Sequence, residues 1–195
     1  MKGVLVRVGI DSTCGYWNAP YDPKTGRFVY VPIPEGDEDL HPDLVRRIIE
    51  VIRNHKGKTG QTFYLQSKKP LCLKPHLKTL PDSVAVVTTL ETNRDEGYDK
   101  VSKAPPPSER FRQFLSLDYP RKVVTIEPAM DFDAEEFAGW IARIKPEYVW
   151  LGLNSRNAEV KLPDPSSEKL REFASILVAR GIEVRGKHLR GLEMP

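Results

Sequence analysis

The stretch from residue 122 to residue 155 constrains the fold more than any other part of the sequence. It opens with a short β-branched run at 123–126, which a Glu-Pro pair ends because proline cannot donate a ladder hydrogen bond. A second apolar run follows at 148–151. Between the two runs, apolar side chains recur at the spacing of one helical face: Phe137, Trp140, Ile141 and Ile144. This order predicts a βαβ unit with parallel strands and a right-handed crossover.

The same alternation of apolar strands and amphipathic helices extends along most of the chain. Residues 4–10 predict a strand, a turn at 22–26 predicts a β-hairpin with 27–31, and a helix is expected from Pro42 to about Asn54. Further strands are predicted near residues 62–66, 84–88, 122–126, 147–151 and 182–185. About five parallel strands are too few for a complete eight-stranded barrel. The predicted fold class is therefore α/β, with a partial TIM-type (βα) barrel or an open parallel sheet of about five strands, and an N-terminal strand and hairpin.

The arrangement of these segments leads to further expectations. We expect the strands to lie side by side in chain order, with residues 4–10 extending the sheet beside residues 62–66, because a partial barrel must cover its exposed edges. Homodimerisation is the alternative way to cover an edge. Prolines and acidic residues at 32–39 mark a boundary. They predict an N-terminal unit at 1–40 and a partial barrel at 41–195.

Composition excludes several classes of protein. The 39% hydrophobic and 29% charged fractions are ordinary for a globular domain of 195 residues. No apolar run approaches the roughly 20 residues that span a bilayer, and no signal peptide opens the chain, so we expect a cytoplasmic protein without a membrane partner. The net charge of +3 does not by itself require nucleic acid. The two cysteines, Cys14 and Cys72, cannot form a metal site alone, and no metal site is predicted.

Polar residues gather after four successive predicted strands, in the segments QSKKP, TTLETN, EPAMD and GLNSRN. Because the carboxyl ends of parallel strands meet at one edge, we expect these side chains to converge on one concave rim, with residues 11–14 at its border. The expected rim residues are Ser67, Lys68, Thr89, Glu91, Glu127 and Asn154. Cationic and hydroxyl groups suit a phosphate or carboxylate, and carboxylates suit hydroxyls or amines. This mixture predicts a nucleotide or an S-adenosylmethionine-like ligand.

Local interpretations compete with this site. Glu127 taken alone is more simply a structural carboxylate that accepts hydrogen bonds from loop N–H groups. Arg94 and Asp95 are adjacent and predict a local ion pair. Ser108 is expected to cap the helix that contains Phe111.

Between about residue 63 and residue 190, the order and spacing of several motifs resemble a known family. The segments FYLQSKKP, VVTTLETNRD, SKAPPPSERF, VTIEPAMDF and VWLGLNS resemble the carboxyl half of radical-SAM-like barrel proteins, in particular a phage-associated branch. The first 35 residues are similar to the start of a nucleotide-modification-associated domain. The resemblance implies that S-adenosylmethionine or substrate would face these positions: Thr88, Thr89, Glu91, Glu127 and Asn154.

One departure from that family bears on its chemistry. Radical-SAM enzymes carry a CxxxCxxC motif for an iron–sulfur cluster, and this sequence has only two cysteines. The chain therefore resembles a truncated relative that cannot ligate such a cluster by itself. A cluster-bearing partner protein is one way to supply it.

Two functional hypotheses of different class follow. In the first, the chain is an enzyme or enzyme subunit that acts on nucleotides or nucleic acid, with Glu91 or Glu127 as general base and Ser67, Lys68, Thr88, Thr89 and Asn154 as ligand-binding residues. The alternative is a non-catalytic binding module, or a subunit of a larger modification complex. The retained carboxylates favour the first hypothesis, and the missing cluster motif favours the second. The residues themselves specify no cofactor, whereas the resemblance implies S-adenosylmethionine.

Overall fold

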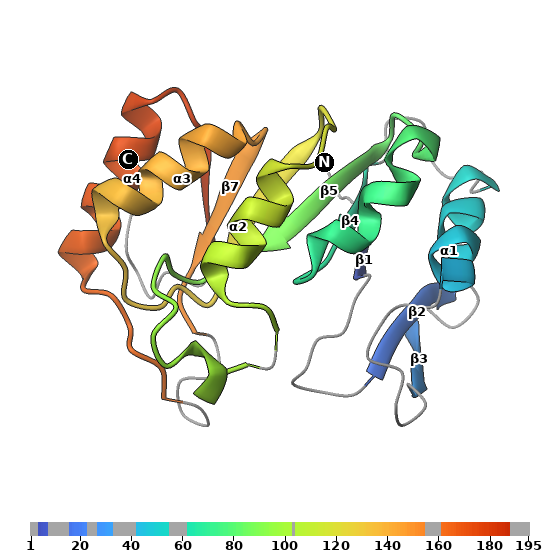
Figure 1. The fold of residues 1–195 in the computed structure, drawn as a ribbon, viewed down its shortest axis with the longest axis horizontal. Coiled ribbons are helices and arrows are strands. Elements are labelled where there is room, and N and C mark those ends of the chain that lie inside the picture. Colours follow the sequence, from blue (N-terminus) through green and yellow to red (C-terminus); the bar gives the residue numbers. More distant parts are fainter. Residues whose placement is uncertain are drawn as a thin grey trace.

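The structure is a computed structural model that describes residues 4–7, 16–22, 27–32, 42–54, 62–102, 104–154 and 161–187. Its main feature is a parallel sheet with the helices α2, α3 and α4 packed on one face (Figure 1). The bounds of these helices are Pro107–Leu115, Ala134–Ile144 and Ser167–Ala179. The predicted α/β fold is confirmed.

Among the described residues, the sheet contains six strands in the order β1, β4, β5, β6, β7, β8, and every neighbouring pair is parallel. Their bounds are Val4–Arg7, Phe63–Gln66, Val84–Thr89, Lys122–Ile126, Tyr148–Gly152 and Val184–Lys187. From β4 onward the spatial order is the chain order, as predicted. The first strand also takes its predicted place, because Val4 pairs with Phe63 at the start of β4. Residues 8–10 of that predicted strand lie outside the described part of the chain.

The N-terminal hairpin is also confirmed. Strands β2 (Tyr16–Asp22) and β3 (Arg27–Pro32) form a separate antiparallel sheet, whose register shifts between Asn18 and Tyr21. Strand β2 contacts β1, so the hairpin lies near the edge of the main sheet. The predicted division into units at residue 40 stays a prediction.

The helices form where the sequence provides an apolar stripe and suitable ends. Helix α1 (Pro42–Asn54) begins at a proline and buries Ile48, Ile49 and Ile52. Helix α4 begins after Ser166, whose hydroxyl accepts a hydrogen bond from the backbone N–H of Lys169 at 3.2 Å. Two 3₁₀ segments, η1 (Pro70–Thr79) and η2 (Tyr98–Lys100), follow β4 and β5.

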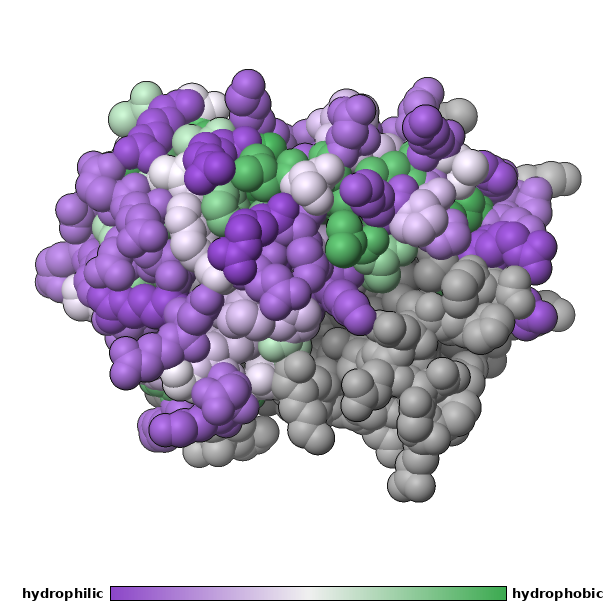
Figure 2. Space-filling model, in the orientation of Figure 1, coloured by the Kyte–Doolittle hydropathy of each residue, from purple (hydrophilic) through white to green (hydrophobic). Residues whose placement is uncertain are grey.

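Alternate residues of the strands divide the interior into two faces. Leu65, Val86, Val124, Ile126 and Leu151 join the helices in the main core. The opposite face of the sheet carries a smaller apolar cluster of Ala85, Val87, Val123 and Tyr148, with Tyr64 and Trp150 packed against it. Hydrophilic side chains cover most of the described surface over the helices (Figure 2). Within the described residues, no helix is long and apolar enough to cross a membrane.

Candidate functional site

The carboxyl ends of β4, β5, β6 and β7 lie along one edge of the sheet, because these strands are parallel neighbours. The predicted site residues occupy these ends in sequence. Ser67 and Lys68 follow β4, Thr88 and Thr89 end β5, Glu91 follows β5, Glu127 follows β6, and Asn154 follows β7. We call this edge the carboxyl edge.

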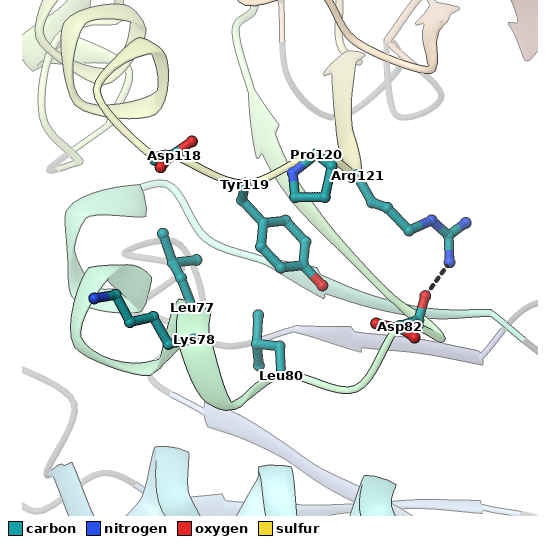
Figure 3. A pocket seen from close by; sticks show the side chains of 8 residues that line it. All are labelled: Leu77, Lys78, Leu80, Asp82, Asp118, Tyr119, Pro120 and Arg121. Atoms are coloured by element: carbon teal, nitrogen blue, oxygen red, sulfur yellow. Dashed lines mark hydrogen bonds between the residues drawn. The ribbon is translucent and has the colours of Figure 1, made fainter.

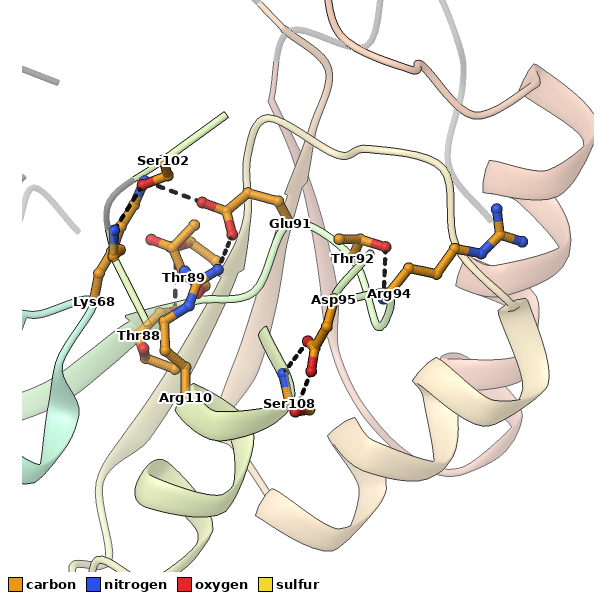
Figure 4. A network of polar contacts seen from close by, with 12 residues as sticks. Lys68, Thr88, Thr89, Glu91, Thr92, Arg94, Asp95, Ser102, Ser108 and Arg110 are labelled. Atoms are coloured by element: carbon orange, nitrogen blue, oxygen red, sulfur yellow. Dashed lines mark hydrogen bonds and ion pairs between the residues drawn. The ribbon is translucent and has the colours of Figure 1, made fainter. Parts of the chain in front are cut away.

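A cluster of buried charges at this edge is centred on Glu91 (Figure 4). One oxygen of the Glu91 carboxylate lies 2.6 Å from Nη2 of Arg110, and the other lies 3.1 Å from Nζ of Lys68. The side chain of Arg110 is 0% exposed and that of Glu91 is 4% exposed, whereas that of Lys68 is 21% exposed. Lys68 is therefore the member of the trio that reaches solvent.

The cations keep the Glu91 carboxylate ionised. Burial favours the neutral acid, but the charges of Arg110 and Lys68 and the hydrogen bond from Arg110 outweigh burial and hold the pKa of Glu91 below its ordinary value. A carboxylate with a lowered pKa and a cation on each oxygen is a weak proton acceptor. Its contacts with both cations instead suit Glu91 to hold the Lys68 side chain in position.

Arg110 and Tyr98 are parts of this cluster that the sequence interpretation missed. Nη1 of Arg110 donates to the backbone oxygen of Thr89 at 2.5 Å, and its guanidinium lies 4.9 Å from the centre of the buried Tyr98 ring. Burial, followed by the charge of Glu91, raises the pKa of Tyr98. The available signal was an arginine on the apolar face of a helix, three residues after the buried Pro107 and four before the buried Phe114.

Ser67 and Thr88 join the ends of β4 and β5. The hydroxyl of Thr88 donates to the backbone oxygen of Ser67 at 2.9 Å, and the hydroxyl of Ser67 accepts from the backbone N–H of Lys69 at 3.0 Å. Both residues are buried. These contacts hold the loop that carries Lys68, and the ligand-binding role of Ser67 and Thr88 stays a prediction.

A layer of polar side chains lies on the sheet face opposite the helices. Nε2 of Gln66 donates to the hydroxyls of Thr89 at 2.8 Å and Thr125 at 3.3 Å. The two hydroxyls are themselves hydrogen bonded at 2.8 Å. This layer crosses the three adjacent strands β4, β5 and β6. Thr89 was a predicted site residue, whereas Gln66 and Thr125 were not.

The loops that leave the strand ends are tied to one another. The backbone N–H of Met130 donates to the backbone oxygen of Glu91 at 2.8 Å, and that of Ala129 donates to the backbone oxygen of Gly152 at 2.7 Å. Glu127, half-buried before a cis Glu127–Pro128 bond, and Asn154, which is buried, lie at the next two strand ends. The predicted border at residues 11–14 lies outside the described part of the chain.

The predicted ion pair between Arg94 and Asp95 is wrong. Arg94 instead binds Asp133 through both carboxylate oxygens, at 2.7 and 3.0 Å, and Asp131 at 2.5 Å. Asp95 accepts hydrogen bonds from the backbone N–H and the hydroxyl of Ser108, at 2.9 and 2.5 Å. Ser108 lies inside α2 and not at its cap position, so Asp95 supplies the side chain that satisfies this helix start.

A surface hollow of about 500 Å³ lies at the opposite edge of the sheet, near the amino ends of β5 and β6 (Figure 3). It is lined by Leu77, Lys78, Leu80, Asp82, Asp118, Tyr119, Pro120 and Arg121. Nη1 of Arg121 donates to the backbone oxygen of Asp82 at 2.8 Å, and the hydroxyl of Tyr119 donates to the backbone oxygen of Val84 at 2.8 Å. These polar groups bind the protein's own backbone, and ligands of open α/β sheets bind at the other edge.

The chain's own residues do not fit an iron–sulfur cluster of the radical-SAM type. Such a cluster needs thiolate ligands from a cysteine motif, and the chain has two cysteines. Cys72 follows β4, with its sulfur 3.5 Å from the hydroxyl of Ser67. Among the described residues, no three histidine, cysteine, aspartate or glutamate side chains are grouped to hold a metal ion.

Comparison with known proteins agrees with both resemblances expected from the sequence. A family model described as nucleotide modification associated domain 3 matches residues 2–67. A solved structure described as a radical SAM methyltransferase from Sphaerobacter thermophilus matches with a TM-score of 0.50 and 18% identity, over 77% of this chain and 48% of that chain. A search of curated proteins gives no match.

These matches define the class of fold. At 18% identity the likeness concerns the fold alone, and the chain has an α/β fold similar to that of this methyltransferase. The chain spans about half the length of that methyltransferase. Its N-terminal third is similar to the nucleotide-modification-associated domain.

Proposed function

We propose that this protein binds a nucleotide or an S-adenosylmethionine-like molecule at the carboxyl edge and acts in nucleotide or nucleic-acid modification. The observation that carries the proposal is the cluster of Lys68, Glu91 and Arg110 at the ends of β4 and β5. These three side chains contain two cations and one carboxylate, and Lys68 is the one that reaches solvent. Such a group suits the phosphate of a nucleotide or the carboxylate of S-adenosylmethionine.

The residues take different parts in this proposal. Lys68 binds the anionic group, and Arg110 and Glu91 hold Lys68 in place. Thr89 and Asn154, at the ends of neighbouring strands, add polar contacts for the rest of the ligand. Glu127 is the candidate general base, since the pairing of Glu91 with two cations suits it poorly to accept a proton.

The direction of the chemistry is inferred from the two similarities. The family model concerns nucleotide modification, and the similar structure is described as a methyltransferase. S-adenosylmethionine would supply an activated methyl or adenosyl group when bound, and its carboxylate is a group that Lys68 can bind. A nucleotide or nucleic acid would be the substrate that is modified.

A second candidate function is a non-catalytic binding module or a subunit of a larger modification complex. The specific observation in its favour is the count of two cysteines, which leaves the chain unable to hold a radical-SAM cluster alone. In this version a partner protein supplies the cluster. The carboxyl edge then contributes ligand binding to the assembly.

Titration calorimetry with S-adenosylmethionine and with nucleotides tests the ligand-binding proposal. We expect binding by the wild-type protein and a loss of about tenfold in affinity, or about 1.4 kcal/mol, in Lys68→Met. Lys69→Met is the matched control, because this neighbouring lysine is exposed and its loss removes the same charge. If the wild type binds none of these compounds, or if both variants bind as well as the wild type, the proposal is wrong.

A second measurement separates the enzyme from the module. The wild type and Glu127→Gln are incubated with the bound ligand and a nucleotide substrate, and products are followed by mass spectrometry. The enzyme hypothesis predicts a modified nucleotide with the wild type and a loss of at least about a hundredfold in rate with Glu127→Gln at unchanged affinity. Binding without any product favours the module.

A further inference from the structure

The polar layer below the carboxyl edge has features that the anion site does not use. Gln66, Thr89 and Thr125 come from three adjacent strands and are joined by hydrogen bonds of 2.8 to 3.3 Å. Gln66 and Thr125 are half-buried, so this layer is not sealed inside the main core. A polar group at this depth is stabilised only if its hydrogen-bonding capacity is used.

The hydrogen bonds of the layer leave one acceptor available. Gln66 uses its amide nitrogen to donate to both threonine hydroxyls, so these contacts do not engage its carbonyl oxygen. Within the part of the chain that the structure describes, Oε1 of Gln66 has no hydrogen-bond partner. The layer therefore offers an amide carbonyl oxygen, which suits an N–H donor of a ligand.

An aromatic ring lies beside this layer on the same face of the sheet. Trp150 of β7 pairs in register with Thr125 of β6, so their side chains leave the sheet on the same side. The Trp150 ring meets Tyr148 edge to face, with centroids 6.2 Å apart, and this contact uses at most one face of the indole. Trp150 is half-buried, as is Arg185, its neighbour in register on β8.

Lys68 lies close to Gln66 in the chain, just beyond the end of β4. One residue, the buried Ser67, separates the two. In a nucleotide, one ribose separates the phosphate from the base. A phosphate at Lys68 therefore directs the base toward Gln66 and the polar layer.

We propose that Gln66, Thr125 and Trp150 form a subsite for the base of the ligand, in which the indole stacks on a purine and Oε1 of Gln66 accepts a hydrogen bond from an exocyclic amino group. This inference rests on the proposed ligand site at Lys68 and names its ligand class, an adenine nucleotide. An amino group at the purine 6-position donates to Oε1, whereas the oxygen at that position in hypoxanthine is an acceptor and repels it. Stacking on an aromatic side chain supplies affinity that does not depend on this pairing.

The test compares three probes that differ stepwise: adenosine monophosphate, inosine monophosphate and ribose 5-phosphate. Calorimetry with the full chain should give an affinity for adenosine monophosphate at least about tenfold above that for ribose 5-phosphate, and several-fold above that for inosine monophosphate. Adenosine monophosphate should also quench tryptophan fluorescence, and ribose 5-phosphate should not.

Three variants assign the effect to residues. Trp150→Leu should lower the affinity for adenosine monophosphate about tenfold, abolish the quenching and leave ribose 5-phosphate binding unchanged. Gln66→Met should bring the affinities of the two nucleotides together. Trp140→Phe is the control, because Trp140 lies on the helical side, stacked on Phe111 at 4.6 Å, and this variant should keep the affinity and the quenching.

The outcomes distinguish the subsite from the proposed function. If all three probes bind with equal affinity and depend on Lys68, the anion site stands and the base subsite is wrong. Adenosine monophosphate binding that is unaffected in Trp150→Leu and Gln66→Met also overturns the subsite. If no probe binds the wild type, the subsite fails, and S-adenosylmethionine binding then decides the proposed function.

Discussion

Arg110 is completely buried, and its guanidinium contacts the Glu91 carboxylate, the backbone oxygen of Thr89 and the ring of Tyr98. An isolated ion in such a place would cost several kcal/mol, and pairing offsets most of that cost. The pair therefore adds little net stability compared with well-packed apolar residues. The pair does make the burial of Arg110 and the burial of Glu91 depend on each other, and Glu91 in turn sets the position of Lys68 at the carboxyl edge.

This dependence predicts a non-additive pair of substitutions. Arg110→Met should lower the free energy of unfolding by about 3 kcal/mol, because it leaves the buried Glu91 with Lys68 as its remaining cation in the trio. Glu91→Leu combined with Arg110→Met should recover most of the loss. Urea denaturation measures both values, with Arg112→Met, on the exposed side of the same helix, as the control. Additive losses in the double variant would show that the two side chains do not act as a pair.

At the scale of elements, two helices end in the left-handed backbone region with different residues. Lys145 follows α3 with a φ of 54°, and Gly181 follows the end of α4 with a φ of 75°. A side chain in this region contacts the following carbonyl oxygen unfavourably, and glycine avoids that contact. The end of α3 is therefore less favourable than the end of α4.

Substitution at these two positions should have opposite effects. Lys145→Gly should raise the free energy of unfolding by about 0.5 to 1 kcal/mol, and Gly181→Ala should lower it by about 1 kcal/mol. Nothing lies within 4 Å of the position that a Cβ on Gly181 would take, so the loss reports backbone conformation and not a clash. Thermal unfolding measures both changes. A destabilised Lys145→Gly protein would contradict this account of the helix end.

The elements themselves were predictable because hydrophobic runs and helical spacing directly determine which faces are buried. The strand at 122–126 and the helical face of Phe137, Ile141 and Ile144 follow from the pattern of residues. The polar contacts were less predictable. Arg94 lies next to Asp95 in sequence, yet its partners Asp131 and Asp133 are 37 and 39 residues away, because adjacent side chains leave the chain in different directions.

The candidate site was predictable in position and not in detail. The carboxyl ends of parallel strands meet wherever the strands pair in order, so Lys68 and Glu91 could be placed together. Arg110 was missed, because the pattern of helix α2 draws attention to its phenylalanines. The polar layer of Gln66 and Thr125 was missed as well, since it depends on how far three strands are staggered.

At the scale of the whole molecule, the sheet has a protected centre and less protected sides. Every residue of β5 is buried, and β5 has a strand on each side. In contrast, β8 has partly exposed residues and, among the described strands, one neighbour, β7. Protection of backbone amides follows burial and pairing. The stability of hydrogen bonds should therefore fall from the middle of the sheet outward.

Hydrogen exchange followed by mass spectrometry tests this order. Amides of β5 and β6 should exchange roughly a hundredfold more slowly than those of β8. The experiment is repeated at two protein concentrations, because a second copy that covered the sheet edge would protect β8 more at the higher concentration. Equal protection of β5 and β8 at both concentrations would contradict the predicted order.

The order of strands in the sheet has a consequence for how the chain is made. From β4 onward each strand pairs with the strand that is synthesised next. Each new strand can therefore pair with the strand made just before it. β1 is the exception, because Val4 finds its partner Phe63 only after the hairpin and α1 have been synthesised. Closing that long loop is slower than the local pairings. β1 therefore pairs only after β4 has been synthesised, and the sheet then grows in the direction of translation.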